Sequence, residues 1–207
     1  MFNYITLQKA LAELEKNKEQ FEAVHCKTHC VVLAGPGSGK TKTLTTAIAR
    51  TLNEEVIAPR AIACITYNNE CAIELETRLS KLGVETTGTN FIGTVHSFAL
   101  TQIIMPYYRC VECNIPQDFK VAGSKECRIA IEDAYKKIYQ DSGDPHKQWE
   151  FAKEKRNREL DRTLQSWKGH NKELAEFIEE YEQELRKKEL IDFDDMPLIA
   201  FRMIKEN

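Results

Sequence analysis

Apolar residues in the first hundred positions switch repeatedly between helical and extended spacing. Helical spacing, as in Leu7, Leu11 and Leu14, predicts helices over residues 6–16, 17–24, 42–52, 69–82 and 96–107. Asn17 is expected to cap the second helix and Gly83 to stop the fourth. Short apolar runs predict strands at residues 30–33, 61–66 and 90–95. This alternation predicts an α/β core with a parallel sheet covered by helices.

The pattern changes near Pro106, and residues 124–190 carry almost no strand signal. Helical spacing around Ile129 and Ile138 predicts one helix, and further helices are expected over residues 147–167 and 172–190. A last helix is expected after Asp192, with Pro197 in its first turn, where proline is tolerated. We expect three parts: a core over residues 1–106, a helical insertion subdomain over 107–190, and a return to the core over 191–207.

Composition fits a globular protein and excludes several classes. The chain has 207 residues, of which 42% are hydrophobic and 29% charged. No apolar run is long enough to cross a membrane, and the N-terminus lacks the apolar segment of a signal peptide. Seven cysteines without a secretory signal predict reduced thiols and a cytoplasmic location. A net charge of −3 indicates that any nucleic-acid partner must use a local surface.

The segment A-G-P-G-S-G-K-T at residues 34–41 predicts a phosphate-binding P-loop, because an expected strand precedes it and an expected helix follows it. Backbone N–H groups of such a loop and the N-terminus of its helix face phosphate oxygens. We expect Lys40 to reach the β- and γ-phosphates and Thr41 to ligate Mg²⁺. The full set of candidate ATP-binding residues here is Gly35, Pro36, Gly37, Ser38, Gly39, Lys40, Thr41 and Lys42. Ala34 departs from the strict motif, which has glycine there; the alternative is a glycine-rich turn without a ligand.

Four more segments occur in a fixed order around the P-loop. They are N-K-E-Q at residues 17–20, T-Y-N-N-E-C-A-I-E-L-E-T-R-L at 66–79, G-T-V-H-S-F-A at 93–99 and L-I-D-F-D-D-M at 190–196. Together with the P-loop they resemble the motifs of UvrD/Rep-type superfamily I DNA helicases. The resemblance covers nearly the whole chain and implies a RecA-like P-loop fold, ATP and Mg²⁺ as cofactors, and single-stranded DNA and duplex junctions as partners.

The resemblance also implies roles for single residues. Gln20 would recognise adenine, since a carboxamide donates to N7 and accepts from the 6-amino group. Tyr67, Asn69 and His96 would lie against single-stranded DNA, with the tyrosine ring stacking on bases. The alternatives are a surface glutamine, a tyrosine in the core, an asparagine that only caps a helix, and a histidine that is merely hydrogen-bonded.

Some positions depart from the family pattern. Glu70 replaces a usual lysine, which puts local phosphate contact in doubt, and Val95 replaces a common aromatic residue. Residues 190–196 hold three carboxylates, but in the family this segment is not the Mg²⁺ site. We expect Asp194 or Asp195 to cap the following helix instead.

The apolar strand and D-E-x-Q-D of the family's Walker B motif do not occur in the sequence. We therefore expect the N-terminal part of a helicase, with an incomplete parallel sheet, that binds ATP but does not turn it over. The alternatives are a stand-alone ATP- or DNA-binding module and a different P-loop ATPase with a helical lid. The sequence leaves the oligomeric state open.

The remaining patterns are weaker. Cys110 and Cys113 have zinc-knuckle spacing, but no second pair follows, so no zinc site is expected. His-Cys pairs at residues 25–26 and 29–30 are not expected to bind metal either. Residues 153–162 carry both charge signs and are interpreted as a solvated helix face. Four aromatic residues at helical spacing are expected in the core: Trp149, Trp167, Phe177 and Tyr181.

Overall fold

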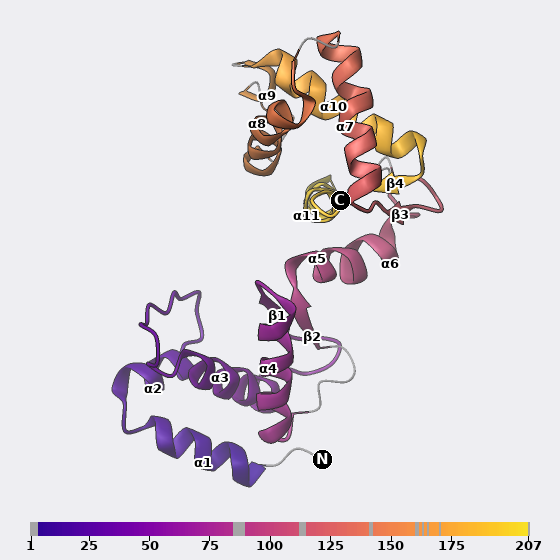
Figure 1. The fold of residues 1–207 in the computed structure, drawn as a ribbon. Coiled ribbons are helices and arrows are strands. Elements are labelled where there is room, and N and C mark those ends of the chain that lie inside the picture. The colour runs from indigo at the N-terminus through magenta and orange to yellow at the C-terminus, as the bar shows by residue number, and fades with distance from the viewer. Residues whose placement is uncertain are drawn as a thin grey trace. The chain divides into compact units, whose positions relative to one another are not determined.

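The structure is a computed structural model that describes residues 4–84, 90–111, 115–140, 143–159, 162, 164, 166–169 and 171–206. It forms two compact units, Met1–Val95 and His96–Asn207 (Figure 1). Each unit has hydrophobic core residues of its own. The division into parts at residues 106 and 190 stays a prediction.

The first unit follows the expected helix and strand order except at residues 30–33. Its elements are α1 (Tyr4–Leu14), α2 (Lys18–His25), α3 (Lys40–Glu54), β1 (Ala63–Thr66), α4 (Asn69–Lys81) and β2 (Phe91–Thr94). The Asn17 side chain accepts a hydrogen bond from the Gln20 N–H and so caps α2 as predicted. Gly83 has a φ of +79° just after α4, which confirms it as the stop. Leu7, Leu11 and Leu14 of α1 are buried in the core of this unit.

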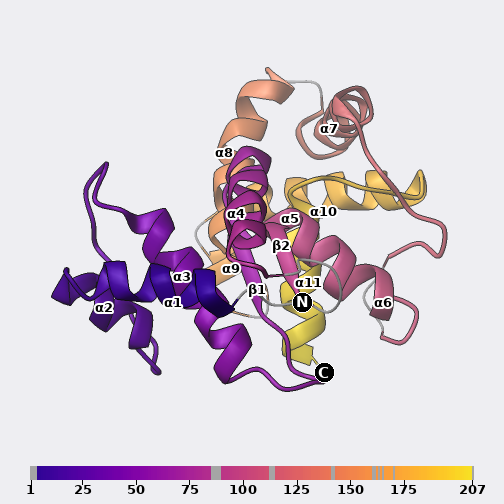
Figure 2. The ribbon, with the colours of Figure 1, turned by 90° about the horizontal axis from the view of Figure 1, so that it is seen from below.

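Strands β1 and β2 pair in parallel, from Ala63 opposite Phe91 to Thr66 opposite Thr94 (Figure 2). Helix α4 connects them, as expected for a β-α-β unit. The parallel arrangement predicted for these two strands is confirmed.

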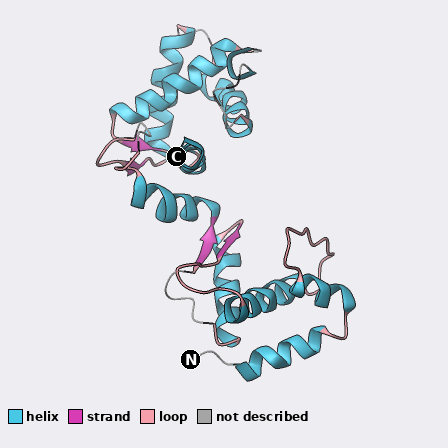
Figure 3. Cartoon of the chain, turned by 180° about the vertical axis from the view of Figure 1, so that it is seen from behind, coloured by secondary structure: helices cyan, strands magenta, loops and turns pink. Residues whose placement is uncertain are grey.

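The predicted strand at residues 30–33 is wrong: the segment has no regular secondary structure, and Figure 3 draws it as loop. A strand exists only through its ladder partners, and no described strand of this unit pairs with it. Val31 and Leu33 are consequently 85% and 91% exposed. A cavity of about 530 Å³ remains beside it, lined among others by Val32, Leu44 and Leu75. The sheet of the described core thus has two strands rather than three.

The second unit is mostly helical, as predicted. Its elements are α5 (Val95–Phe98), which begins one residue before the boundary, a π-helix η1 (Ala99–Ile104), α6 (Met105–Tyr107), β3 (Lys120–Val121), α7 (Ser124–Tyr139), α8 (Pro145–Arg158), α9 (Ser166–Gly169), α10 (Lys172–Lys187), β4 (Leu190–Ile191) and α11 (Asp195–Glu206). The single helix predicted over 147–167 is wrong, because Glu159 leaves helical geometry and ends α8. The short parallel pair β3–β4 was not anticipated.

Helices α7 and α10 enclose the main core of this unit. Trp167, Phe177 and Tyr181 are buried there, and Trp149 packs against them, so these four aromatic residues are core as expected. Asp144 caps α8 through the N–H groups of His146 and Lys147. In the part of the chain that the structure describes, no helix is both long and apolar enough to cross a bilayer.

Candidate functional site

Residues 34–41, which we call the phosphate loop after the predicted motif, contain two glycines in left-handed conformation. Gly37 and Gly39 adopt left-handed φ values of +74° and +88°, which only glycine adopts readily. The Ser38 hydroxyl donates to the Gly35 carbonyl over 2.8 Å and tightens the turn. Ala34 is not among the residues with positive φ, so its departure from the glycine of the strict motif imposes no backbone strain.

Lys40 begins α3 and folds back over the loop. Its Nζ donates to the carbonyls of Ala34 and Gly35, each over 2.7 Å. The ammonium therefore lies against the backbone of the loop. Thr41 follows in the first turn of α3, so its hydroxyl belongs to the same end of the helix.

Gln20 contacts the phosphate loop directly. Its Nε2 donates to the Ser38 carbonyl over 2.6 Å, although 18 residues separate them in sequence. A Cβ at Gly39 would come within 2.8 Å of this Nε2. The structure therefore brings Gln20 to the loop, and its carboxamide touches backbone there.

Lys42, the last candidate of the loop set, points elsewhere. Its Nζ pairs with the Glu13 carboxylate of α1, and this hydrogen bond lowers the pKa of Glu13. The pair ties α1 to α3. It gives Lys42 a partner outside the phosphate loop.

Tyr67 and Asn69 follow the carboxyl end of β1. Tyr67 is 97% exposed, so the interpretation as a core residue is wrong. The cap of α4 is Asn68, whose side chain accepts from the Cys71 N–H over 2.9 Å. Asn69 is therefore not the cap, and its exposed side chain lies in the first turn of α4.

His96 of the second unit stacks on a residue that the sequence interpretation passed over. The centroids of the His96 and Phe193 rings lie 3.8 Å apart, with 20° between the ring planes. Phe193 is 55% exposed. Burial lowers the pKa of His96, against a smaller opposing effect of Asp194. The available signal for Phe193 was an aromatic residue inside the acidic motif at 190–196.

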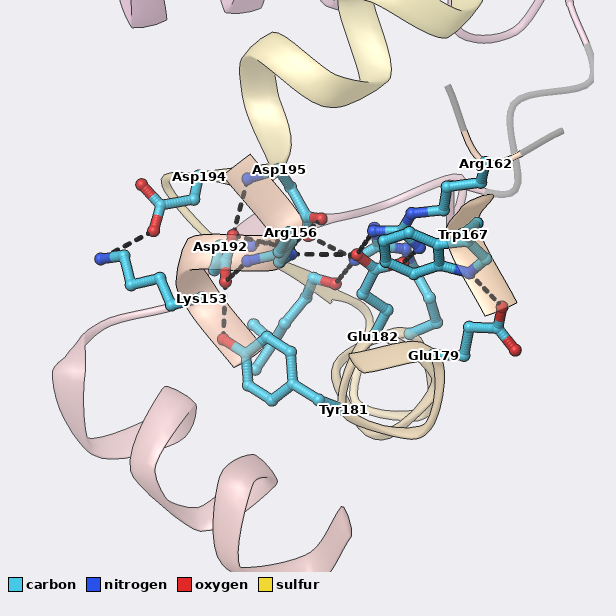
Figure 4. Close-up of polar contacts among 12 residues, drawn as sticks. Lys153, Arg156, Arg162, Trp167, Glu179, Tyr181, Glu182, Asp192, Asp194 and Asp195 are labelled. Atoms are coloured by element: carbon cyan, nitrogen blue, oxygen red, sulfur yellow. Dashed lines mark hydrogen bonds and ion pairs between the residues drawn. The ribbon is translucent and has the colours of Figure 1, made fainter. Parts of the chain in front are cut away.

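Figure 4 shows a buried arginine that pairs with Asp192 and Asp195, two acidic residues of the same turn. Arg156 of α8 is 0% exposed, so the solvated-face interpretation is wrong for this residue. Its guanidinium pairs with Glu182, Asp192 and Asp195, and the Tyr181 hydroxyl donates to Asp192 over 2.6 Å. We call Arg156, Tyr181, Glu182, Asp192 and Asp195 the Arg156 cluster.

Within this cluster the helix cap differs from the expected one. The Asp195 N–H donates to the Asp192 carboxylate over 2.7 Å, and the Asp192 N–H donates to the Asp195 carboxylate over 3.0 Å. Asp192 therefore caps α11, in a reciprocal pair resembling a capping box. Burial raises the pKa of Asp195, but Arg156 and Arg186 outweigh it and hold that pKa below its usual range. Both carboxylates are thus paired with arginine side chains of the protein.

Among the described residues, no group of three or more histidine, cysteine or acidic side chains is arranged so that it could hold a metal ion, and this includes the described members of the cysteine patterns. Cys110 is exposed and free, and Cys113 lies outside the described residues.

Comparison with known proteins agrees with the motifs. The family described as UvrD/REP helicase N-terminal domain matches residues 16–207. The ATP-dependent DNA helicase SRS2 of Saccharomyces cerevisiae is 29% identical, over 84% of this chain and 17% of that protein. The ATP-dependent DNA helicase Rep of Buchnera aphidicola is 30% identical, over 86% and 28%. DNA helicase II of Escherichia coli is 33% identical, over 53% and 15%.

The chain thus spans less than a third of the length of each of these relatives. The family match covers the phosphate loop, the residues after β1 and β2, and the Arg156 cluster. The chain belongs to the UvrD/REP helicase N-terminal domain family.

Proposed function

We propose that this chain is the ATP-binding N-terminal part of a helicase or translocase that couples ATP hydrolysis to movement on single-stranded DNA. The observation that carries the proposal is the preformed phosphate loop, with Gly37 and Gly39 left-handed and Lys40 folded over its carbonyls. Family membership adds the expected reaction, because the relatives are named as ATP-dependent DNA helicases.

In this proposal the loop binds the phosphates of ATP·Mg²⁺. Backbone N–H groups and the N-terminus of α3 face the phosphates, Lys40 binds the β- and γ-oxygens, and the Thr41 hydroxyl ligates Mg²⁺. The Gln20 carboxamide contacts the loop at the Ser38 carbonyl. To recognise adenine, the carboxamide would exchange this carbonyl for the base. The fit to Mg²⁺ rests on a hydroxyl at the first turn of the helix, an oxygen ligand of the kind Mg²⁺ prefers.

Single-stranded DNA is the proposed second ligand. Tyr67 presents an almost fully exposed ring, and Asn69 offers a carboxamide beside it. In the second unit, His96 and Phe193 form a stacked pair whose exposed phenylalanine offers a ring to a base. Aromatic rings accept any base, so binding should be independent of sequence and weakened by salt.

The nucleotide part of the proposal is tested with Lys40→Ala. Loss of this charge-assisted contact, about 1.5–3 kcal/mol, should weaken ATP binding by an order of magnitude or more. Lys9→Ala, an exposed lysine of α1, is the matched control and should bind ATP like the parent. Equal ATP affinity of Lys40→Ala and the parent in calorimetry would refute the phosphate assignment.

The DNA part is tested with Tyr67→Ala and fluorescence anisotropy of a labelled oligonucleotide. Loss of one stacking platform should cost about 1–3 kcal/mol of binding free energy. Tyr107→Ala removes another exposed tyrosine, from α6, and serves as the control. If both variants bind DNA like the parent, Tyr67 is not part of the DNA site.

A further inference from the structure

Among the described residues of the second unit, Arg156 is the most deeply buried charge, and it holds a turn 36 to 39 residues away in sequence. Its Nε donates to Glu182 over 3.0 Å, its Nη1 donates to Asp192 over 2.8 Å, and its Nη2 donates to both Asp192 and Asp195. All three nitrogens of the guanidinium thus donate hydrogen bonds to carboxylates. This planar fork is a geometry that lysine cannot reproduce.

Stability alone is a weak explanation for this arrangement. Well-packed apolar side chains often replace a buried ion cluster without loss of stability, because taking charges out of water is costly. Unlike apolar packing, the hydrogen bonds of the Arg156 cluster fix the orientation of each carboxylate.

The turn presents its two middle residues. Asp192 and Asp195 hold each other's backbone N–H and point into the cluster. Phe193, between them, is 55% exposed and stacks on His96. Asp194 pairs with Lys153 over 2.9 Å.

Lys153 and Arg156 lie three residues apart on α8, a spacing that puts them on one face of the helix. One helix therefore holds the turn at two points, from inside through Arg156 and from outside through Lys153 (Figure 4).

We propose that Arg156 is a positioning residue of the DNA site: by fixing the turn from Asp192 to Asp195, it holds the Phe193 ring against His96. Helix α8 thereby sets the geometry of a DNA contact that its own side chains do not make. This inference rests on the proposed DNA-binding role of His96 and Phe193.

The first test is Arg156→Lys, which keeps the charge and loses the fork. Binding of single-stranded DNA should weaken roughly threefold to tenfold, a part of what one stacking ring contributes. The NMR signals of the His96 ring should shift, because Phe193 no longer lies against it. ATP affinity should equal that of the parent, since the phosphate loop belongs to the other unit.

The matched control is Arg158→Lys, two residues further along α8. Arg158 has a side chain 76% exposed and pairs only with Glu154 among the ion pairs of the described residues. It should leave DNA affinity and the His96 signals unchanged. If Arg156→Lys unfolds, the combination Arg156→Met, Asp192→Asn and Asp195→Asn removes three of the buried charges together, and Asn can still cap the helix. Glu182 keeps its ion pair with Arg162 in this variant. It should fold and show the same loss of DNA binding.

Parent-like DNA affinity and parent-like His96 signals in either folded variant would overturn the positioning role. Phe193→Leu separates this outcome from failure of the proposed function. If Phe193→Leu binds DNA like the parent, the DNA role of the ring pair is wrong. If it binds more weakly while Arg156→Lys does not, the DNA role stands and the positioning role of Arg156 is wrong.

Discussion

The phosphate loop and the Arg156 cluster are built in opposite ways. Residues 34–41 form the loop from consecutive backbone, with left-handed glycines and a lysine that folds over its own carbonyls. The Arg156 cluster joins side chains from α8, α10 and the turn before α11, which are far apart in sequence. A site made of local backbone is encoded in a short motif, whereas a cluster of distant side chains exists only after the helices have packed.

The largest expected effect concerns the rate of ATP hydrolysis, for which a local phosphate-binding motif is not sufficient. The phosphate loop should bind ATP, but hydrolysis also needs groups that position water and stabilise charge, and an arginine finger alone is worth on the order of 10³–10⁵ in rate. The sequence contains no apolar strand followed by Asp-Glu. We expect no DNA-stimulated phosphate release from this chain.

A phosphate-release assay with single-stranded DNA, run beside Lys40→Ala, checks this expectation. Turnover that rises with DNA and disappears in Lys40→Ala would contradict it. The 207 residues would then hold a complete ATPase.

The same contrast explains what the sequence could and could not predict. The β1–α4–β2 order was predicted correctly, because short segments with defined spacing determine it. The ligand roles of Lys40 and Gln20, taken from short motifs, stay predictions. The strand at residues 30–33 was predicted from its apolar run, yet pairing needs a neighbour that no local pattern reveals. It is therefore the part of the α/β core where prediction and structure differ.

The Arg156 cluster shows the same limit for a site. Arg156 lies in a stretch of mixed charge that looks like a solvated face, and nothing nearby in sequence marks it as buried. Phe193 was visible inside a recognised motif, but its stacking on His96 depends on packing between segments almost a hundred residues apart. Neither contact follows from helical spacing.

Substitution of two glycines tests whether the conformation of the phosphate loop depends on glycine. Gly39 has a φ of +88°, and a Cβ there would also meet Gln20. Gly39→Ala should therefore cost about 1–2 kcal/mol of stability and displace Gln20. Gly35, where an added Cβ meets nothing within 4 Å, is the control, and Gly35→Ala should change stability by less than about 0.5 kcal/mol.

Thermal unfolding of both variants measures the difference. Equal melting temperatures for Gly39→Ala and Gly35→Ala would mean that the loop relaxes without strain. The loop conformation would then not depend on glycine at position 39.

The smallest expected effect is the loss of stability at low pH that follows from protonation of Glu184, which pairs with two lysines in the helical unit. Hydrogen bonds from Lys137 and Lys187 lower the pKa of Glu184 to about 2. Because this folded-state pKa lies below the unfolded value, the pair stabilises the unit above about pH 4.3 and loses that effect as the pH falls toward 2. Solvent screens the half-exposed lysines, so we expect only about 1 kcal/mol.

Trp149 and Trp167 are the two tryptophans of the chain and both belong to the second unit, so their fluorescence follows its unfolding alone. Glu184→Gln should destabilise this unit by about 1 kcal/mol at pH 7 and not at pH 2, because the lost charge matters only where Glu184 is ionised. Glu176→Gln, on the same helix and paired with a lysine whose side chain is 73% exposed, is the control and should change little at either pH. An equal loss of stability at pH 7 and pH 2 in Glu184→Gln would show that this side chain contributes packing rather than charge.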